Sequence, residues 1–73
     1  MIITIKLNEQ YNEDFGKFLN DRDWKYEMKD DAYIIRIKGM IRYGEFTTLG
    51  NEEGKEIHIG NYQIEYYKIE EVK

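Results

Sequence analysis

The sequence contains no cysteine, no proline and no serine, and His58 is its only histidine. Serine and cysteine supply the nucleophiles of most acyl-transfer enzymes, and zinc sites are assembled from several cysteine or histidine side chains. These absences remove most of the usual catalytic groups, so we predict that the chain is not an enzyme and holds no metal or other cofactor. Because disulfide bonds are also excluded, the fold has to rest on packed apolar side chains or on a partner chain. A homodimer is therefore one expectation.

Long apolar runs are missing as well. No run approaches the ~20 residues that span a bilayer, and the first residues lack the basic lead and apolar stretch of a signal peptide. We therefore expect a cytoplasmic protein with no membrane contact. The 73 residues allow one small domain, residues 1–73, and 41% hydrophobic content is too high for a disordered acidic tail.

The net charge of −4 is spread unevenly along the chain. Residues 1–21 carry two basic and four acidic side chains, residues 22–42 carry six and four, and residues 43–73 carry three and seven. The middle of the chain is thus mildly basic between two acidic ends. An acidic protein is attracted to basic partners, although charge alone says nothing about the fold.

The first seven residues alternate in hydrophobicity with the period of a β-strand. Met1, Ile3, Ile5 and Leu7 fall on one face, and their β-branched neighbours agree with a strand.

From Asn8 the apolar spacing becomes helical. Asn8 or Asn12 could cap the start of this helix, which ends within residues 20–23. Gly16 lies inside the pattern, which indicates close packing on the sheet or a shorter helix. The apolar face consists of Tyr11, Phe15, Phe18 and Leu19.

The remaining residues read as short strands and turns. An alternating run from Trp24 to Met28, a turn at residues 29–32 and a second run over residues 33–38 predict a hairpin. Residues 40–46 read as one further strand with Gly44 as a bulge, and residues 50–55 read as a polar loop.

The C-terminal third is more ambiguous. Ile57 and Ile59 mark a short strand, and the turn residues Gly60 and Asn61 let residues 62–69 return as its hairpin partner. Helical spacing also fits residues 62–73, but we expect a strand. The fold class is therefore α+β: one helix packed on a mainly antiparallel sheet of four to six short strands, in the order β-α-β-β-β-β-β.

His58 is flanked by two isoleucines, so it should point outward when they point inward. A general base would need an orienting carboxylate, for which Glu56 and Glu65 are candidates across the last hairpin. A cross-strand ion pair explains these residues equally well, and a solvated surface histidine is the simplest interpretation. The carboxylates do not follow the spacing of a calcium loop, and no phosphate-binding glycine motif is present.

The basic middle of the chain gives one functional hypothesis. If the aromatic residues of the first hairpin face the helix, its cations gather on the open face of the sheet, where a nearby tyrosine could stack on a base. The overall acidity opposes this, because a nucleic-acid-binding domain usually carries a basic excess. The candidate nucleic-acid-binding residues are Lys25, Lys29, Arg36, Lys38 and Arg42.

The seven tyrosines give the main hypothesis. One helix and a small sheet cannot cover all of them, and exposed tyrosine is favoured where proteins meet. We therefore predict a small non-catalytic protein that occupies a surface of another macromolecule. The candidate protein-binding residues are Tyr43, Tyr62, Tyr66, Tyr67, Glu52 and Glu53.

The class of partner follows from charge and composition. Clustered carboxylates could mimic nucleic acid and enter a basic nucleic-acid-binding groove of another protein. The lysine, glutamate, isoleucine, asparagine and tyrosine usage is typical of AT-rich genomes, so we expect an inhibitor of a host protein encoded by a phage or mobile element. In that case the protein acts in the cytoplasm of the host cell.

Overall fold

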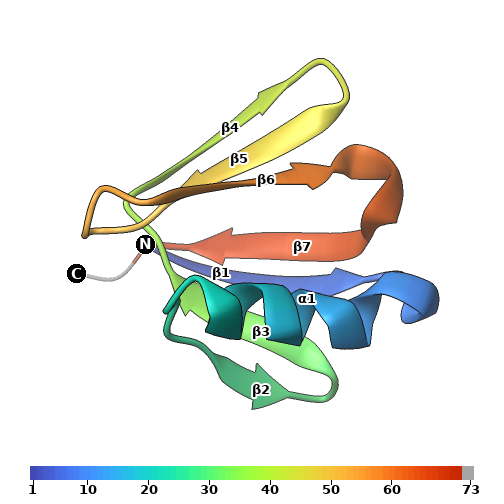
Figure 1. Cartoon of the computed structure of the whole chain (residues 1–73). Helices are drawn as coiled ribbons and strands as arrows, with labels where there is room; N and C mark the ends of the chain where they lie inside the picture. Colours follow the sequence, from blue (N-terminus) through green and yellow to red (C-terminus); the bar gives the residue numbers. More distant parts are fainter. Residues whose placement is uncertain (72–73) are drawn as a thin grey trace.

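The computed structural model, which describes residues 1–71, has one α-helix and seven strands in two antiparallel sheets (Figure 1). This confirms the predicted α+β class with a single helix after the first strand. The elements are β1 (Ile2–Leu7), α1 (Glu9–Asp21), β2 (Glu27–Lys29), β3 (Ala32–Arg36), β4 (Gly39–Tyr43), β5 (Phe46–Gly50), β6 (Glu56–Gly60), a 3-10 turn (Asn61–Gln63) and β7 (Ile64–Glu70).

The four-stranded sheet has the order β2-β3-β1-β7. The predicted alternation of β1 is confirmed, because Ile3, Ile5 and Leu7 are buried while their neighbours are partly exposed. The register places Ile3 opposite Ile35 of β3, and on the same face Ile64 and Tyr67 of β7 pack against the core, so one face of three strands contributes to it.

The predicted hairpin between β2 and β3 is also present, with Lys29 opposite Ala32 and Asp30-Asp31 as its two-residue turn. Both aspartates have positive φ, 53° and 64°, as a type I′ turn requires.

Helix α1 covers the inner face of the four-stranded sheet (Figure 1). Asn8 is at the N-cap position, but its side chain donates to the Tyr62 carbonyl and does not cap the helix. The Asn12 side chain instead accepts from the Leu7 backbone amide at 2.9 Å and donates to the Asp31 carbonyl. These bonds fix the start of the helix to the end of β1 and to the turn between β2 and β3.

The three-stranded sheet has the order β4-β5-β6, and here the structure differs from the sequence prediction. Residues 40–46 do not form one strand, because Gly44 and Glu45 make a two-residue turn and the chain reverses. Gly44 has a φ of +61° and is a turn residue, not a bulge. Residues 1–71 therefore form seven strands in two sheets, one strand more than the predicted order β-α-β-β-β-β-β.

The C-terminal strand is confirmed as a strand, but its predicted partner is wrong. A 3-10 turn follows β6, and β7 then crosses to pair with β1 of the other sheet. A register shift between Lys6 and Leu7 places Ile64 and Tyr67 on the same side of β7 although they are three residues apart.

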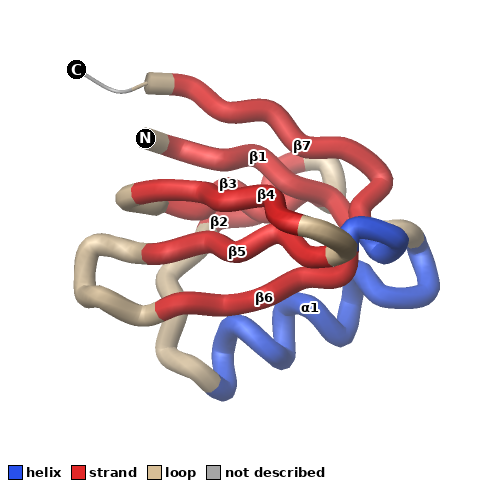
Figure 2. Tube along the Cα trace, turned by 90° about the horizontal axis from the view of Figure 1, so that it is seen from above, coloured by secondary structure: helices blue, strands red, loops and turns tan. Residues whose placement is uncertain are grey.

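The core lies between the four-stranded sheet, α1 and the inner face of the three-stranded sheet (Figure 2). The chain passes from one sheet to the other at Ile37 and Lys38, whose amides bond to Met1 and Gly50 respectively. The buried apolar cluster consists of Ile3, Ile5, Leu7, Phe15, Leu19, Trp24, Tyr33, Ile35, Ile37, Leu49, Ile57 and Ile59. Among residues 1–71, no helix combines the length and apolar character needed to cross a membrane.

Candidate binding surface

The outer face of the three-stranded sheet carries a group of exposed apolar side chains. Ile41 is 65% exposed, Tyr43 85% and Phe46 54%. Tyr43 and Phe46 are directly opposite each other across β4 and β5, and Ile41 is two residues along the same strand as Tyr43. We call Ile41, Tyr43 and Phe46 the apolar face.

The local sequence explains why these three side chains are together. The Gly44-Glu45 turn places the residues on either side of it in register, and directly opposed residues of antiparallel strands point to the same side. On the opposite side of the same sheet, Leu49 of β5 and Ile57 and Ile59 of β6 enter the core. The apolar face is therefore held on a rigid, well-packed sheet.

Polar groups border the apolar face. Thr48 lies between Ile41 and His58 in the same cross-strand row, and the Thr48 Oγ1 is 2.8 Å from the His58 Nδ1. His58 is exposed, as the flanking isoleucines predicted. Glu65 is not its neighbour, because β6 and β7 do not pair and Glu65 forms an ion pair with Lys6 at 3.3 Å.

The turn end of the sheet is braced from its inner side. Thr47 is fully buried, and its hydroxyl bonds to the Asn61 side chain and accepts from the Arg42 Nε at 3.1 Å. Asn61 also donates to the Gly44 carbonyl at 3.2 Å. The guanidinium of Arg42 reaches the Tyr67 hydroxyl at 3.1 Å and lies 5.0 Å from the centre of that ring.

The tyrosines singled out from the sequence do not form one surface. Tyr43 alone belongs to the apolar face. Tyr62 is in the 3-10 turn and packs edge-on against Tyr11 at 5.8 Å, while Tyr66 is opposite Lys6 in the other sheet. Tyr67 is half-buried and lies beside Arg42, away from the apolar face.

Sequence reasoning missed Ile41 and Phe46. In a single strand over residues 40–46, Tyr43 and Phe46 would lie three positions apart along the same strand and not opposite each other, so the pair could not be recognised. The available signal was a glycine followed by one polar residue between two aromatic residues, which is typical of a two-residue hairpin turn.

Glu52 and Glu53 are in the loop between β5 and β6, at the opposite end of the sheet from Tyr43. The Asn51 side chain accepts from the Glu53 and Lys55 amides at 3.0 and 2.9 Å and so orders this loop. A shallow hollow beside the loop is lined by both glutamates together with Lys25 and Arg36.

The basic residues are divided between the two sheets. Lys29 and Arg36 are on the outer face of the four-stranded sheet, which they share with Glu27. Lys38 lies between β3 and β4, and Arg42 is on the other sheet, turned toward Thr47 and Tyr67. These cations are exposed, but they do not make one continuous basic face.

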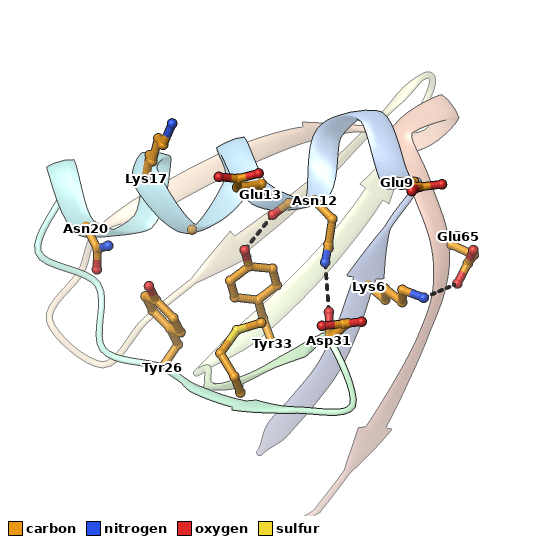
Figure 3. A pocket seen from close by; sticks show the side chains of 12 residues that line it. Lys6, Glu9, Asn12, Glu13, Lys17, Asn20, Tyr26, Asp31, Tyr33 and Glu65 are labelled. Carbon is orange, nitrogen blue, oxygen red and sulfur yellow. Dashed lines mark hydrogen bonds and ion pairs between the residues drawn. The ribbon is translucent and has the colours of Figure 1, made fainter.

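A shallow groove of about 760 Å³ runs between α1 and the β2-β3 hairpin (Figure 3). The residues that line it include Lys6 and Lys17, but also Glu9, Glu13 and Glu65, so charges of both signs border it.

At the floor of this groove, the Tyr33 hydroxyl donates to the Asn12 carbonyl (Figure 3). Burial raises the pKa of Tyr33, which keeps its hydroxyl neutral. The groove thus shows neither a paired acid and base nor a charge of one sign that would select a ligand.

Within residues 1–71, no three histidine, aspartate or glutamate side chains come close enough together to hold a metal ion. Comparisons of the chain with protein-family models, curated proteins and solved structures found no match.

Proposed function

We propose that this chain is a non-catalytic binding protein that uses the apolar face to contact another protein. The observation that carries the proposal is the exposure of Ile41, Tyr43 and Phe46 side by side on one rigid hairpin. Tyrosine and phenylalanine are enriched at the centres of protein interfaces, where they supply contact area at a low cost in side-chain entropy.

The arrangement around the apolar face supports a protein partner. Interfaces typically have an apolar centre and a polar rim, and here Thr48, His58 and Glu56 occupy the adjoining positions of the same face. Because the other side of the same sheet packs on the core, the backbone that carries these side chains is ordered before binding. Such preorganisation reduces the entropy lost on association.

Charge suggests which partner fits. Glu45 and Glu56 flank the apolar face, Glu52 and Glu53 follow at the loop end, and the chain carries a net charge of −4. We propose a partner with a basic rim around an apolar pocket, such as a nucleic-acid-binding groove. Electrostatic attraction of this kind mainly speeds association and weakens with salt. Inhibition of a host protein by a phage or mobile-element product stays a prediction from composition.

The alternative, a nucleic-acid-binding module, has less support. The outer face of the four-stranded sheet carries Lys6, Lys29, Arg36 and Lys68, but Lys6 and Lys68 form ion pairs with Glu65 and Glu70. A phosphate backbone would have to compete with those carboxylates.

A comparison of two tyrosine variants tests the proposal. Tyr43→Ala removes the most exposed ring of the apolar face, and Tyr66→Ala removes an exposed ring from the other sheet as a matched control. Proteins captured from the native host by the tagged wild-type chain are purified, and their affinities for all three chains are measured by calorimetry. We expect Tyr43→Ala to weaken binding at least about tenfold, as an interface hot spot does, while Tyr66→Ala leaves it unchanged.

Equal binding by all three chains would contradict the proposal. The alternative is tested by gel shift with single- and double-stranded oligonucleotides at low and moderate salt. A shift that falls steeply with salt and is lost in Arg36→Ala would favour the nucleic-acid interpretation.

A further inference from the structure

The edges of the two sheets differ in how they are protected from pairing with another strand. An exposed strand edge presents unpaired backbone groups, which proteins commonly protect with charged side chains, short length or proline. Strand β2 has three residues, two of them charged, and β7 carries Glu65, Lys68 and Glu70. Strand β6 carries Glu56 and His58 and lies beside α1.

Strand β4 lacks these protections. Its sequence Gly-Met-Ile-Arg-Tyr has one charged residue, Arg42, whose guanidinium is turned toward Thr47 and Tyr67. Figure 1 shows β4 at the outer edge of its sheet, with β5 on its other side. Ile41 and Tyr43 are strongly exposed along it.

The hairpin turn determines which backbone groups of β4 are free. The pair that closes a two-residue turn, Tyr43 and Phe46, exchanges hydrogen bonds, and bonded and non-bonded pairs alternate from there. The amides and carbonyls of Gly39, Ile41 and Tyr43 therefore point to β5. Those of Met40 and Arg42 point to the open edge.

We propose that β4 pairs antiparallel with β4 of a second copy of this chain, around a two-fold axis through Ile41. A two-fold axis perpendicular to the sheet lets the pairing centre on Met40, Ile41 or Arg42. Centring on Arg42 would place two guanidinium groups opposite each other, and centring on Met40 would place Lys38 opposite Arg42. Like charges in such positions destabilise a sheet. The Ile41 register alone avoids both conflicts.

Both backbone and side chains fit in the Ile41 register. Ile41 lies opposite Ile41 of the second copy. Met40 of each chain exchanges backbone hydrogen bonds with Arg42 of the other, which gives about four new hydrogen bonds. Tyr43 of one copy lies opposite Gly39 of the other, where nothing comes within 4 Å of the position a Cβ would take. An aromatic ring over an edge glycine is a known stabilising arrangement.

The ends of the paired strands are also complementary in charge. Lys38 of one copy is opposite Gly44 of the other, next to Glu45, so each end of the pairing brings a cation to a carboxylate.

The two three-stranded sheets then join into one six-stranded sheet. The two apolar faces become neighbours on it, which enlarges the surface for a partner. The pairing itself does not depend on that partner, so it goes beyond the proposed function.

Disulfide formation tests the register directly, because the chain has no cysteine of its own. Residues of a non-bonded antiparallel pair have Cα atoms about 4.5 Å apart, within the range that a disulfide spans. Ile41→Cys should oxidise to a covalent dimer at least about tenfold faster than Phe46→Cys, which places a cysteine on the same face one strand away. Wild-type chain should show a concentration-dependent dimer by sedimentation. Equal oxidation rates, or a wild type that stays monomeric at every concentration, would overturn the proposal.

A charge exchange at the same position gives an independent test. Ile41→Lys and Ile41→Glu should each be monomeric, because two like charges would face each other at the two-fold axis. In a 1:1 mixture opposite charges face each other there, so the dimer should form again. Thr48→Lys puts a charge in the same row one strand inward and should leave the dimer intact. Far-UV circular dichroism checks that each variant folds. If the mixture stays monomeric while the wild type dimerises, the pairing lies elsewhere and the proposal is wrong.

The two proposals can fail separately. Neither dimer test uses a partner protein, so a chain that dimerises but binds nothing would contradict the proposed function alone. If the wild-type chain is monomeric and Tyr43→Ala loses its binding to the partner protein, only the dimer proposal is contradicted.

Discussion

The phenol of Tyr33 fills the space in which a side chain at Gly16 would lie: its oxygen is 2.8 Å from the position of a Cβ on that glycine. This close approach lets Tyr33 donate to the Asn12 carbonyl and pack edge-on against Phe15 at 4.9 Å. The glycine that weakens the helix by up to about 1 kcal/mol thus allows the helix to rest on β3.

Gly16→Ala should destabilise the fold even though alanine is the better helix former. The added methyl group forces Tyr33 to move in a packed core, at a cost of about 1 to 3 kcal/mol before the gain in helix propensity. Urea unfolding measures the change.

The double variant Gly16→Ala/Tyr33→Phe provides the control. Removing the hydroxyl makes room for the methyl, so the double variant should be more stable than Gly16→Ala alone. If the double variant loses as much stability as Gly16→Ala and Tyr33→Phe together, the contact between the two residues is not the cause of the destabilisation.

The sequence predicted local elements well and long-range pairing poorly. Periodicity located β1 and the buried face of α1, because each depends on side chains a few positions apart. The β1-β7 pairing joins Ile3 to Ile69, and no local pattern encodes that contact. The apolar face escaped notice because the choice at Gly44 between a bulge and a turn determines whether Phe46 continues the strand of Tyr43 or lies opposite it on a returning strand.

Tyr33 should also make stability fall at alkaline pH. Burial raises the pKa of its hydroxyl above the ordinary value of 10.0, so the folded state keeps the proton that the unfolded chain releases. The stabilisation linked to that proton is complete below pH 10 and is lost as pH rises through the folded-state pKa.

Tyr33→Phe should therefore flatten the decline of the free energy of unfolding above pH 10, measured by urea titration at several pH values. Tyr43→Phe is the control. It removes a hydroxyl from an exposed ring, so the decline of stability with pH should stay as in the wild type. Identical profiles for the wild type and Tyr33→Phe would show that the hydroxyl is not linked to folding.

Two neighbouring threonines should respond differently to the same substitution. Thr47 is buried and bonds to Asn61 and Arg42, so Thr47→Val should cost about 1 to 3 kcal/mol because the Asn61 Oδ1 loses its donor and the Arg42 Nε its acceptor. Thr48 faces outward beside His58, and Thr48→Val should change stability by no more than about 0.5 kcal/mol. Thermal unfolding compares the two, and equal losses would contradict the bracing role given to Thr47.

A substitution in the Asp30-Asp31 turn should stabilise the fold. Both residues have positive φ, and this left-handed region costs an ordinary side chain roughly 1 kcal/mol or more, with aspartate less penalised. Glycine adopts the region freely, and an Asp-Gly pair is a preferred type I′ turn. Asp31→Gly should thus raise the free energy of unfolding by up to about 1 kcal/mol.

Glu52→Gly is the matched control for the turn, because Glu52 is also in an exposed loop but its φ is not positive. There glycine only increases the freedom of the unfolded chain, so stability should fall by about 0.4 to 1 kcal/mol. Opposite signs for the two substitutions, measured by urea unfolding, would follow from backbone conformation alone. A loss of stability in both would mean that the Asp31 side chain contributes more than its backbone strain costs.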